Sequence, residues 1–116
     1  MTLVKFDSDM EAIGATSYSA GAGPVHRGER MEVSKLSFEK GGGADIHRHP
    51  EEQVMYVLSG RLRVTCGDET YEVGPGEATF NPSNAPHGVT ALEDVVALSF
   101  KNQVSAATGE APGSAG

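Results

Sequence analysis

Glycine and proline divide the middle of this chain into short segments, and this limits the fold that it can adopt. The 116 residues include 15 glycines and 6 prolines. Clusters at 41–43, 74–76 and 82–86 separate short runs rich in apolar and β-branched residues. Such runs are typical of strands joined by turns, and no segment has a convincing helical period. The pattern predicts an all-β sandwich or barrel.

The expected strands can be placed from these runs. They cover residues 3–6, 29–38, 44–49, 53–58, 61–66, 70–74, 77–81, 87–92 and 95–100. Ser59 and Gly60 predict a two-residue hairpin turn between 53–58 and 61–66. The apolar parity of 29–38 shifts between Val33 and Leu36, which indicates a β-bulge. Residues 14–24 are expected to form a loop, 1–104 a single domain, and 105–116 a flexible tail with little to bury.

Composition narrows the classes of partner. The formal net charge is −7, which disfavours nucleic acid and anionic membrane surfaces as partners. Cys66 is the only cysteine, so an intrachain disulfide and a zinc site built from several thiolates are excluded. The first ten residues are charged and have no apolar run, so we expect neither a signal peptide nor a transmembrane helix. A cytoplasmic protein is expected.

Two histidines stand one residue apart in the segment 47–53, which reads HRHPEEQ. Residues i and i+2 of a strand point to the same face, so His47 and His49 are expected to project together. This spacing suits a metal chelate, although a histidine pair alone is a weak signal. Glu51, Glu52 and Gln53 follow, and each carries an oxygen that could bind the same ion.

The wider spacing resembles the two signature motifs of the cupin superfamily. The first motif is Gly-x5-His-x-His-x3,4-Glu-x6-Gly, and the second is Gly-x5-Pro-x-Gly-x2-His-x3-Asn. The anchors that match are Gly41, His47, His49, Gly60, Gly76, Pro82 and His87. Gln53 and Asn84 fall in register at the positions of the motif glutamate and of the second-motif glycine. The resemblance implies a cupin double-stranded β-helix, a jelly-roll barrel. His26 lies outside both motifs and is expected on the surface.

What the resemblance implies for the site is one divalent metal ion held by His47, His49, Gln53 and His87. Gln53 stands where the motif has glutamate, and it fits both residue counts, so Glu51 and Glu52 are expected at a solvated rim. Asn84 replaces a glycine and tolerates the left-handed conformation. Ala91 replaces an asparagine that is not a ligand position. The donor atoms suit Mn, Fe, Co, Ni, Cu or Zn.

Three imidazoles and an amide cancel none of the charge of a divalent ion. The ion would be a strong Lewis acid that favours small anionic ligands. A hairpin with Ser59-Gly60 at its turn would pair Met55 with Val64 and place Cys66 opposite Gln53. Met55 and Cys66 are therefore expected in the substrate pocket, and Phe100, the last-strand phenylalanine of the resembled family, is expected there too.

Within the superfamily, the chain looks most like the small pectin-degradation cupins that linearise unsaturated uronates and use a His-His-Gln-His site. The acid and the arginine that assist catalysis in those enzymes are absent, since Leu98 occupies the position of the acid and only Lys101 is a nearby cation. The favoured hypothesis is a Lewis-acid isomerase, tautomerase or lyase acting on a small oxo, hydroxy or sugar acid. A metal-dependent dioxygenase and a non-catalytic metal-binding or ligand-binding module stay open. A homodimer, with 3–6 as a swapped strand, is expected.

Overall fold

The computed structural model describes residues 1–7, 11–14 and 19–103. The expected tail at 105–116 lies outside the described residues. Those residues form strands and no helix, which confirms the all-β prediction, and so none of them forms a helix that could cross a membrane. The strands are β1 (Ala12–Ile13), β2 (Gly23–Arg27), β3 (Met31–Phe38), β4 (Gly43–His47), β5 (Gln53–Ser59), β6 (Leu62–Cys66), β7 (Glu69–Val73), β8 (Ala78–Asn81), β9 (His87–Ala91) and β10 (Val95–Asn102).

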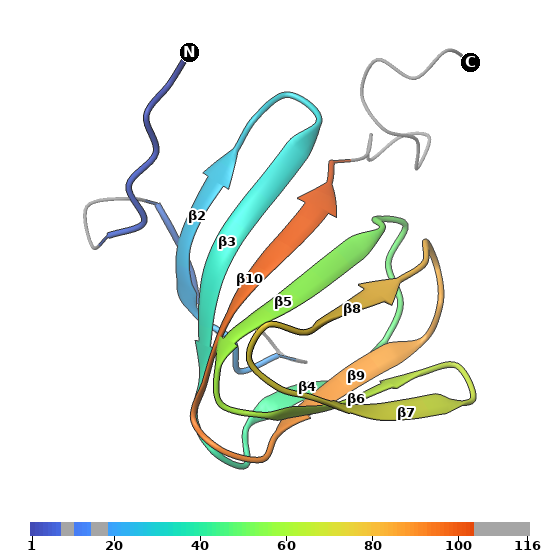
Figure 1. Ribbon diagram of the computed structural model, residues 1–116. Helices are drawn as coiled ribbons and strands as arrows, with labels where there is room; N and C mark the ends of the chain where they lie inside the picture. The colour runs from blue at the N-terminus through green and yellow to red at the C-terminus, as the bar shows by residue number, and fades with distance from the viewer. Residues whose placement is uncertain (8–10, 15–18, 104–116) are drawn as a thin grey trace.

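Two antiparallel sheets pack face to face and form a jelly roll (Figure 1). One has six strands in the order β1-β2-β3-β10-β5-β8, and the other has four in the order β4-β9-β6-β7. Alternate residues of both sheets point inward and bury their apolar side chains between the sheets. This core consists of Leu36, Phe38, Met55, Val57, Leu62, Val64, Val73, Ala91, Val95 and Ala97.

Strand β3 has no bulge between Val33 and Leu36, so the prediction of a bulge there is wrong. It pairs with β10 without a shift in register, and its inward residues include Ser34, Leu36 and Phe38. The apparent change of parity arises because Ser34, a polar residue, occupies an inward and fully buried position. The irregularity in this sheet lies instead between Val96 and Ala97, where β10 pairs with β5.

The predicted hairpin between β5 and β6 is wrong, because these strands belong to different sheets. Strand β5 lies between β10 and β8, and β6 lies between β9 and β7, so both edges of each strand are already paired. Gly60, with φ of 83°, turns the chain from one sheet to the other. Val57 and Leu62 both belong to the core between the sheets, where they are almost completely buried.

The N-terminal segment also differs from its prediction. Residues 3–6 form no strand, and they run outside the two sheets (Figure 1). Leu3 is 79% exposed, whereas Val4 and Phe6 are half-buried. The first strand is β1, which pairs with β2. Strand β2 begins at Gly23, so it includes the last two residues of the loop expected at 14–24.

Candidate metal centre

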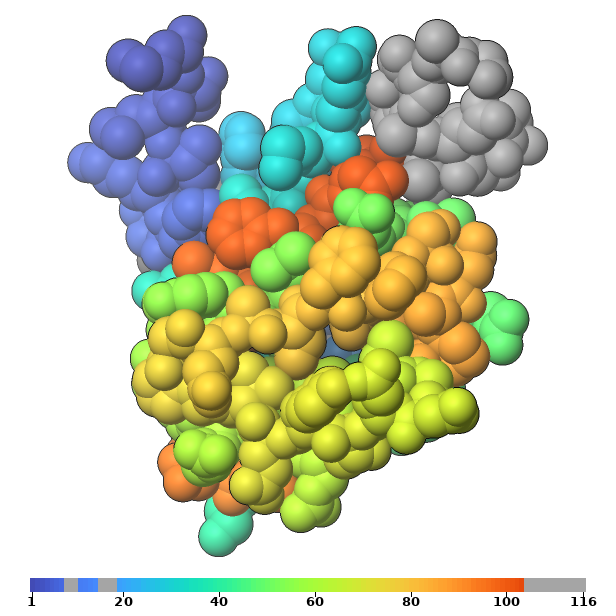
Figure 2. All heavy atoms as spheres, turned by 45° about the vertical axis from the view of Figure 1, so that its right-hand side comes forward, coloured from blue at the N-terminus to red at the C-terminus, as the bar shows by residue number. Residues whose placement is uncertain are grey.

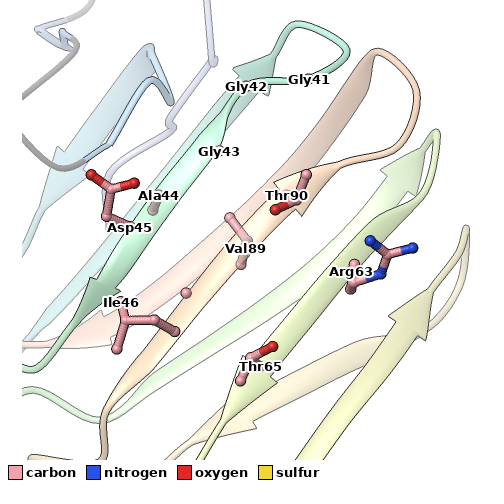
Figure 3. A pocket seen from close by; sticks show the side chains of 11 residues that line it. Gly41, Gly42, Gly43, Ala44, Asp45, Ile46, Arg63, Thr65, Val89 and Thr90 are labelled. Carbon is pink, nitrogen blue, oxygen red and sulfur yellow. The ribbon is translucent and has the colours of Figure 1, made fainter.

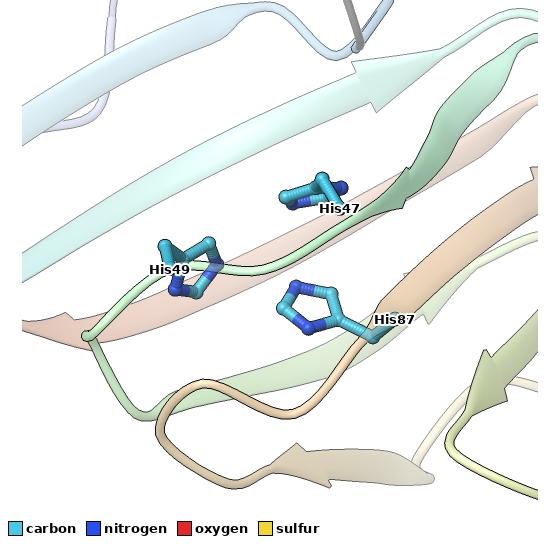
Figure 4. Close-up of side chains that lie close together, drawn as sticks. All are labelled: His47, His49 and His87. Atoms are coloured by element: carbon cyan, nitrogen blue, oxygen red, sulfur yellow. The ribbon is translucent and has the colours of Figure 1, made fainter.

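Three histidines converge where the ends of two neighbouring strands meet a loop (Figure 4). His47 is the last residue of β4, His87 is the first residue of β9, and the two are cross-strand partners. The ring centre of His49 lies 5.4 Å from that of His47 and 4.7 Å from that of His87. The ring centres of His47 and His87 are 4.5 Å apart. His49 lies beyond the end of β4. The prediction that His47 and His49 project together assumed that both lie in one strand, and only His47 does.

The loop before β9 is held against the loop that carries His49. The backbone N–H of Asn84 donates to the carbonyl oxygen of His49 at 2.8 Å, and the Ser83 hydroxyl donates to the carbonyl of Pro50 at 2.6 Å. Asn84 has φ of 61°, the left-handed conformation expected at this motif position, which asparagine tolerates better than most residues. These contacts join the two segments that supply the histidines.

Hydrogen bonds set the same tautomer in all three rings. The Nδ1 atom of His47 lies 2.7 Å from the carbonyl oxygen of Asp45. The Nδ1 atom of His49 lies 2.9 Å from the carbonyl oxygen of Glu51. The Nδ1 atom of His87 lies 2.9 Å from the carbonyl oxygen of Ala85. A carbonyl only accepts, so each Nδ1 carries the proton and each Nε2 keeps its lone pair. One ligand atom from each ring lies within 4.8 Å of the others.

The Nε2 atom of His87 is the observation that tests whether a metal ion fits. This atom is buried and has no hydrogen-bond partner among the described residues. A buried acceptor without a partner is costly, and a metal ion at the convergence of the three rings would satisfy it. The histidines are thus positioned to bind a metal ion, and the structure does not identify the element.

Burial and nearby charge both favour neutral imidazoles, which is the form that binds metals. Burial lowers the pKa of His49 below its ordinary value, and the positive charge of Lys101 lowers it further. Burial also lowers the pKa of His87, with smaller contributions from His47, His49 and Lys101. The carbonyl hydrogen bonds act in the opposite direction at both residues. At neutral pH these two rings are ready to bind a cation without first losing a proton.

These lowered pKa values predict how the stability of the metal-free protein depends on pH. In the unfolded chain both histidines regain a pKa of 6.5. As the pH falls below about 6.5, the unfolded chain takes up protons that the folded chain resists, so the free energy of unfolding decreases until the lowered pKa is passed. Urea unfolding at several pH values measures this decrease. His49→Gln is expected to make this decrease in the free energy of unfolding smaller, and a decrease as large as that of the wild-type chain would contradict the assignment.

Gln53 opens β5 and is 7% exposed. Its Nε2 donates to the Ser99 hydroxyl at 2.8 Å, which leaves the amide oxygen free to act as a ligand. Gln53 lines a cavity of about 90 Å³ together with His47, His49 and His87. The geometry is compatible with Gln53 as a fourth ligand, and that role stays a prediction.

The three expected pocket residues occupy three different places. Met55 is buried and lines the cavity with the histidines. Cys66 is the cross-strand partner of His87, not of Gln53, and it lines a separate hollow between β7 and β8. Phe100 points to the outer face of its sheet, because the inward positions of β10 are occupied by Ser99 and Lys101, so its expected place in the pocket is wrong.

The two glutamates of the segment 47–53 differ in their surroundings. Glu52 is exposed, and its backbone N–H donates to the side-chain oxygen of Asn102. Glu51 is half-buried, and its carboxylate lies 3.3 Å from Nδ1 of His49. Glu51 therefore helps to orient His49. This contact was not expected from a position at a solvated rim. The residue spacing alone gave no signal for this contact.

Lys101 and Asn81 also line the cavity of the histidines. Lys101 was noted from the sequence only as a nearby cation, and Asn81 was not singled out at all. A further depression of about 340 Å³ lies on the outer face of the four-stranded sheet, where Arg63 and Thr90 contribute (Figure 3). That face points away from the histidines, so this depression is separate from the candidate metal centre.

Comparison with known proteins agrees with this fold. Residues 34–100, more than half of the chain, match the cupin domain family, so the chain belongs to the cupin family. Oxalate decarboxylase OxdC of Bacillus subtilis is 31% identical over 71 residues, which is 57% of this chain and 18% of that protein. An uncharacterized protein of Methanocaldococcus jannaschii is 25% identical over 72 residues, or 61% of this chain and 58% of that protein. The chain thus matches only part of the length of each relative.

Solved structures share the architecture. An RmlC-like cupin from Shewanella frigidimarina superposes with a TM-score of 0.74 at 17% identity, covering 92% of this chain and 96% of that one. KdgF from a Halomonas species superposes with a TM-score of 0.69 at 21% identity, covering 84% of this chain and 92% of that one. At these identities the likeness concerns the fold.

Proposed function

We propose that the protein is a divalent-metal-dependent enzyme of the isomerase, tautomerase or lyase type that acts on a small oxo, hydroxy or sugar acid. The observation that carries the proposal is the convergence of three histidines, with one ligand atom of each within 4.8 Å of the others, in one cavity with the uncharged Gln53. A divalent ion at this place would polarise a carbonyl or carboxylate oxygen of the substrate. Because the proposed ligands are neutral, the full charge of the ion would act on an anion.

Lys101 supports an anionic substrate independently of the metal. It is the cross-strand partner of Gln53 and lies on the same inner face of the sheet. Its ammonium is 3.9 Å from the carboxylate of Glu32, whereas Arg27 binds that carboxylate at 2.8 Å. Arg27, which also pairs with Glu11, is the nearer partner of Glu32. Lys101 lines the cavity of the histidines and brings a positive charge to a carboxylate that binds there.

Two of the similar proteins carry names of enzymes that act on small molecules. The names oxalate decarboxylase, in Bacillus subtilis, and DMSP lyase, for a structure from Ruegeria pomeroyi, describe reactions of small molecules at a cupin fold. They support a small substrate here and leave its identity open. On the resemblance to small cupins and the acidic composition with a single cysteine, we propose a homodimer in the cytoplasm.

Hydrogen exchange at carbon tests this proposal. The Zn²⁺-loaded protein in deuterium oxide is expected to speed deuteration next to the carbonyl of pyruvate, oxaloacetate or 2-oxoglutarate, which proton magnetic resonance records. Lys101→Met is expected to raise the KM for exchange about fivefold, because one charge contact to the carboxylate is lost. Lys35→Met is the matched control, since Lys35 lies on the outer face of the same sheet, opposite Leu98.

Two outcomes would contradict the proposal. The first is that none of the three acids exchanges faster with the Zn²⁺-loaded protein than with the metal-free protein. The second is that the Fe²⁺-loaded protein consumes oxygen with these acids while no metal form promotes exchange, which would favour the dioxygenase alternative.

A further inference from the structure

One polar row crosses the inner face of the six-stranded sheet beside the histidines. Its members are Glu32 on β3, Lys101 on β10, Gln53 on β5 and Asn81 on β8, and each is the cross-strand partner of the next. Cross-strand partners point to the same side of a sheet. Lys101 and Asn81 therefore flank Gln53, each at a strand spacing of about 4.8 Å.

Asn81 is the member of this row whose hydrogen bonding is incomplete. The residue is 2% exposed, and its amide oxygen Oδ1 is buried without a hydrogen-bond partner among the residues that the structure describes. Leaving a buried amide oxygen unpaired destabilises the folded protein, and native structures contain few such groups. An unpaired oxygen at this place indicates that something outside the described protein atoms binds it.

The position of Asn81 shows from where a ligand can reach it. Asn81 lines the cavity of the histidines, and it also lines a hollow of about 650 Å³ between the edge strands β7 and β8. Figure 2 shows the molecule hollowed between these two strands. The hollow is acidic, with Glu69, Glu72 and Glu77 in its lining. An anionic ligand is therefore favoured on the side of Lys101 and the histidines.

We propose that Asn81 is a substrate-binding residue whose Oδ1 accepts a hydrogen bond from a hydroxyl group of the acid; this inference rests on the acid-binding site proposed above. An unpaired acceptor repels a carboxylate and attracts a donor, and a hydroxyl or enol is the donor that a small acid can offer. The carboxylate then lies toward Lys101 and the hydroxyl toward Asn81. The site selects hydroxy acids over acids that lack the hydroxyl.

Calorimetric titration of the Zn²⁺-loaded protein with glycolate and acetate tests the selection, since these acids differ only by one hydroxyl. The wild-type chain is expected to prefer glycolate, and Asn81→Leu is expected to reduce that preference about fivefold or more, through weaker glycolate binding. Thr79→Val is the matched control. It removes another unpaired, buried oxygen from the same face of β8, but Thr79 lines only the hollow, so the preference should persist.

A second variant and a second readout keep the test decisive. Asn81→Asp preserves shape and acceptor, so both acids should bind more weakly while the preference for glycolate remains. The metal-free Asn81→Leu protein should unfold a few degrees higher than the wild-type chain, because an unpaired buried oxygen is gone. A residue needed only for structure would give the opposite shift.

The outcomes separate the two proposals. If neither acid binds the Zn²⁺-loaded wild-type chain, the proposed acid-binding function fails. If both acids bind and Asn81→Leu leaves their affinity ratio unchanged, or Asn81→Asp abolishes the preference, the role of Asn81 is overturned while the proposed function stands. Asn81 would then hold only an internal water molecule.

Discussion

A chain carrying His49→Ala is expected to bind Zn²⁺ on the order of 100 times more weakly than the wild-type chain. Removal of groups that merely orient a ligand typically costs about 10-fold to 100-fold in metal affinity, and loss of the ligand itself should reach at least the upper end of that range. A ring nitrogen of His49 is one of three ligand atoms that lie within 4.8 Å of one another. Competition with a coloured chelator measures the affinity.

The choice of His49 keeps folding and binding separate. The side chain is 14% exposed, lies in a loop and is not part of the hydrophobic core, so its truncation removes little of that core. His26→Ala is the matched control, since His26 lies on β2 opposite Val33, on the outer face of the sheet. Equal Zn²⁺ affinity in both variants, with unchanged circular dichroism, would exclude the histidine cluster as the metal site.

The local features of this fold could be predicted from sequence, because they depend on neighbouring residues. Eight of the expected strands overlap observed strands, and the left-handed conformation at Asn84 follows from its place in a glycine position of the motif. Pairing between strands could not be predicted in this way. The turn at Gly60 is compatible with a hairpin, but it joins two sheets, because other strands pair with both edges of β5 and β6.

The candidate site shows the same division between local and distant information. The motif spacing identified the three histidines, which the fold brings together. Polar residues on the inner face were missed, since an inward-facing side chain is inferred from apolar alternation. Ser34 appeared as a break in that alternation, and Asn81 appeared as an ordinary strand end. Phe100 was misplaced for a related reason, because the inward positions beside it carry Ser99 and Lys101.

Gln53→Glu is the substitution that tests why an amide stands beside the histidines. A carboxylate would cancel one charge of a divalent ion, so the affinity for Zn²⁺ is expected to rise by about 30-fold, while the affinity for acetate falls by about 10-fold or more. Chelator competition gives the first quantity and calorimetric titration the second. Gln53→Leu, which offers no oxygen, is expected to weaken Zn²⁺ binding instead.

Gln53→Glu is expected to raise the affinity for Zn²⁺ and Gln53→Leu to lower it, so the two variants together distinguish a metal ligand from a structural residue. A purely structural role of Gln53, through its hydrogen bond to Ser99, would predict similar losses of Zn²⁺ binding in both variants, because both remove the N–H donor. Glu52→Gln is the charge control, since Glu52 is exposed and its neutralisation should change neither quantity. If Gln53→Glu gains no metal affinity, Gln53 is not a ligand, and the full positive charge assumed for the bound ion loses its basis.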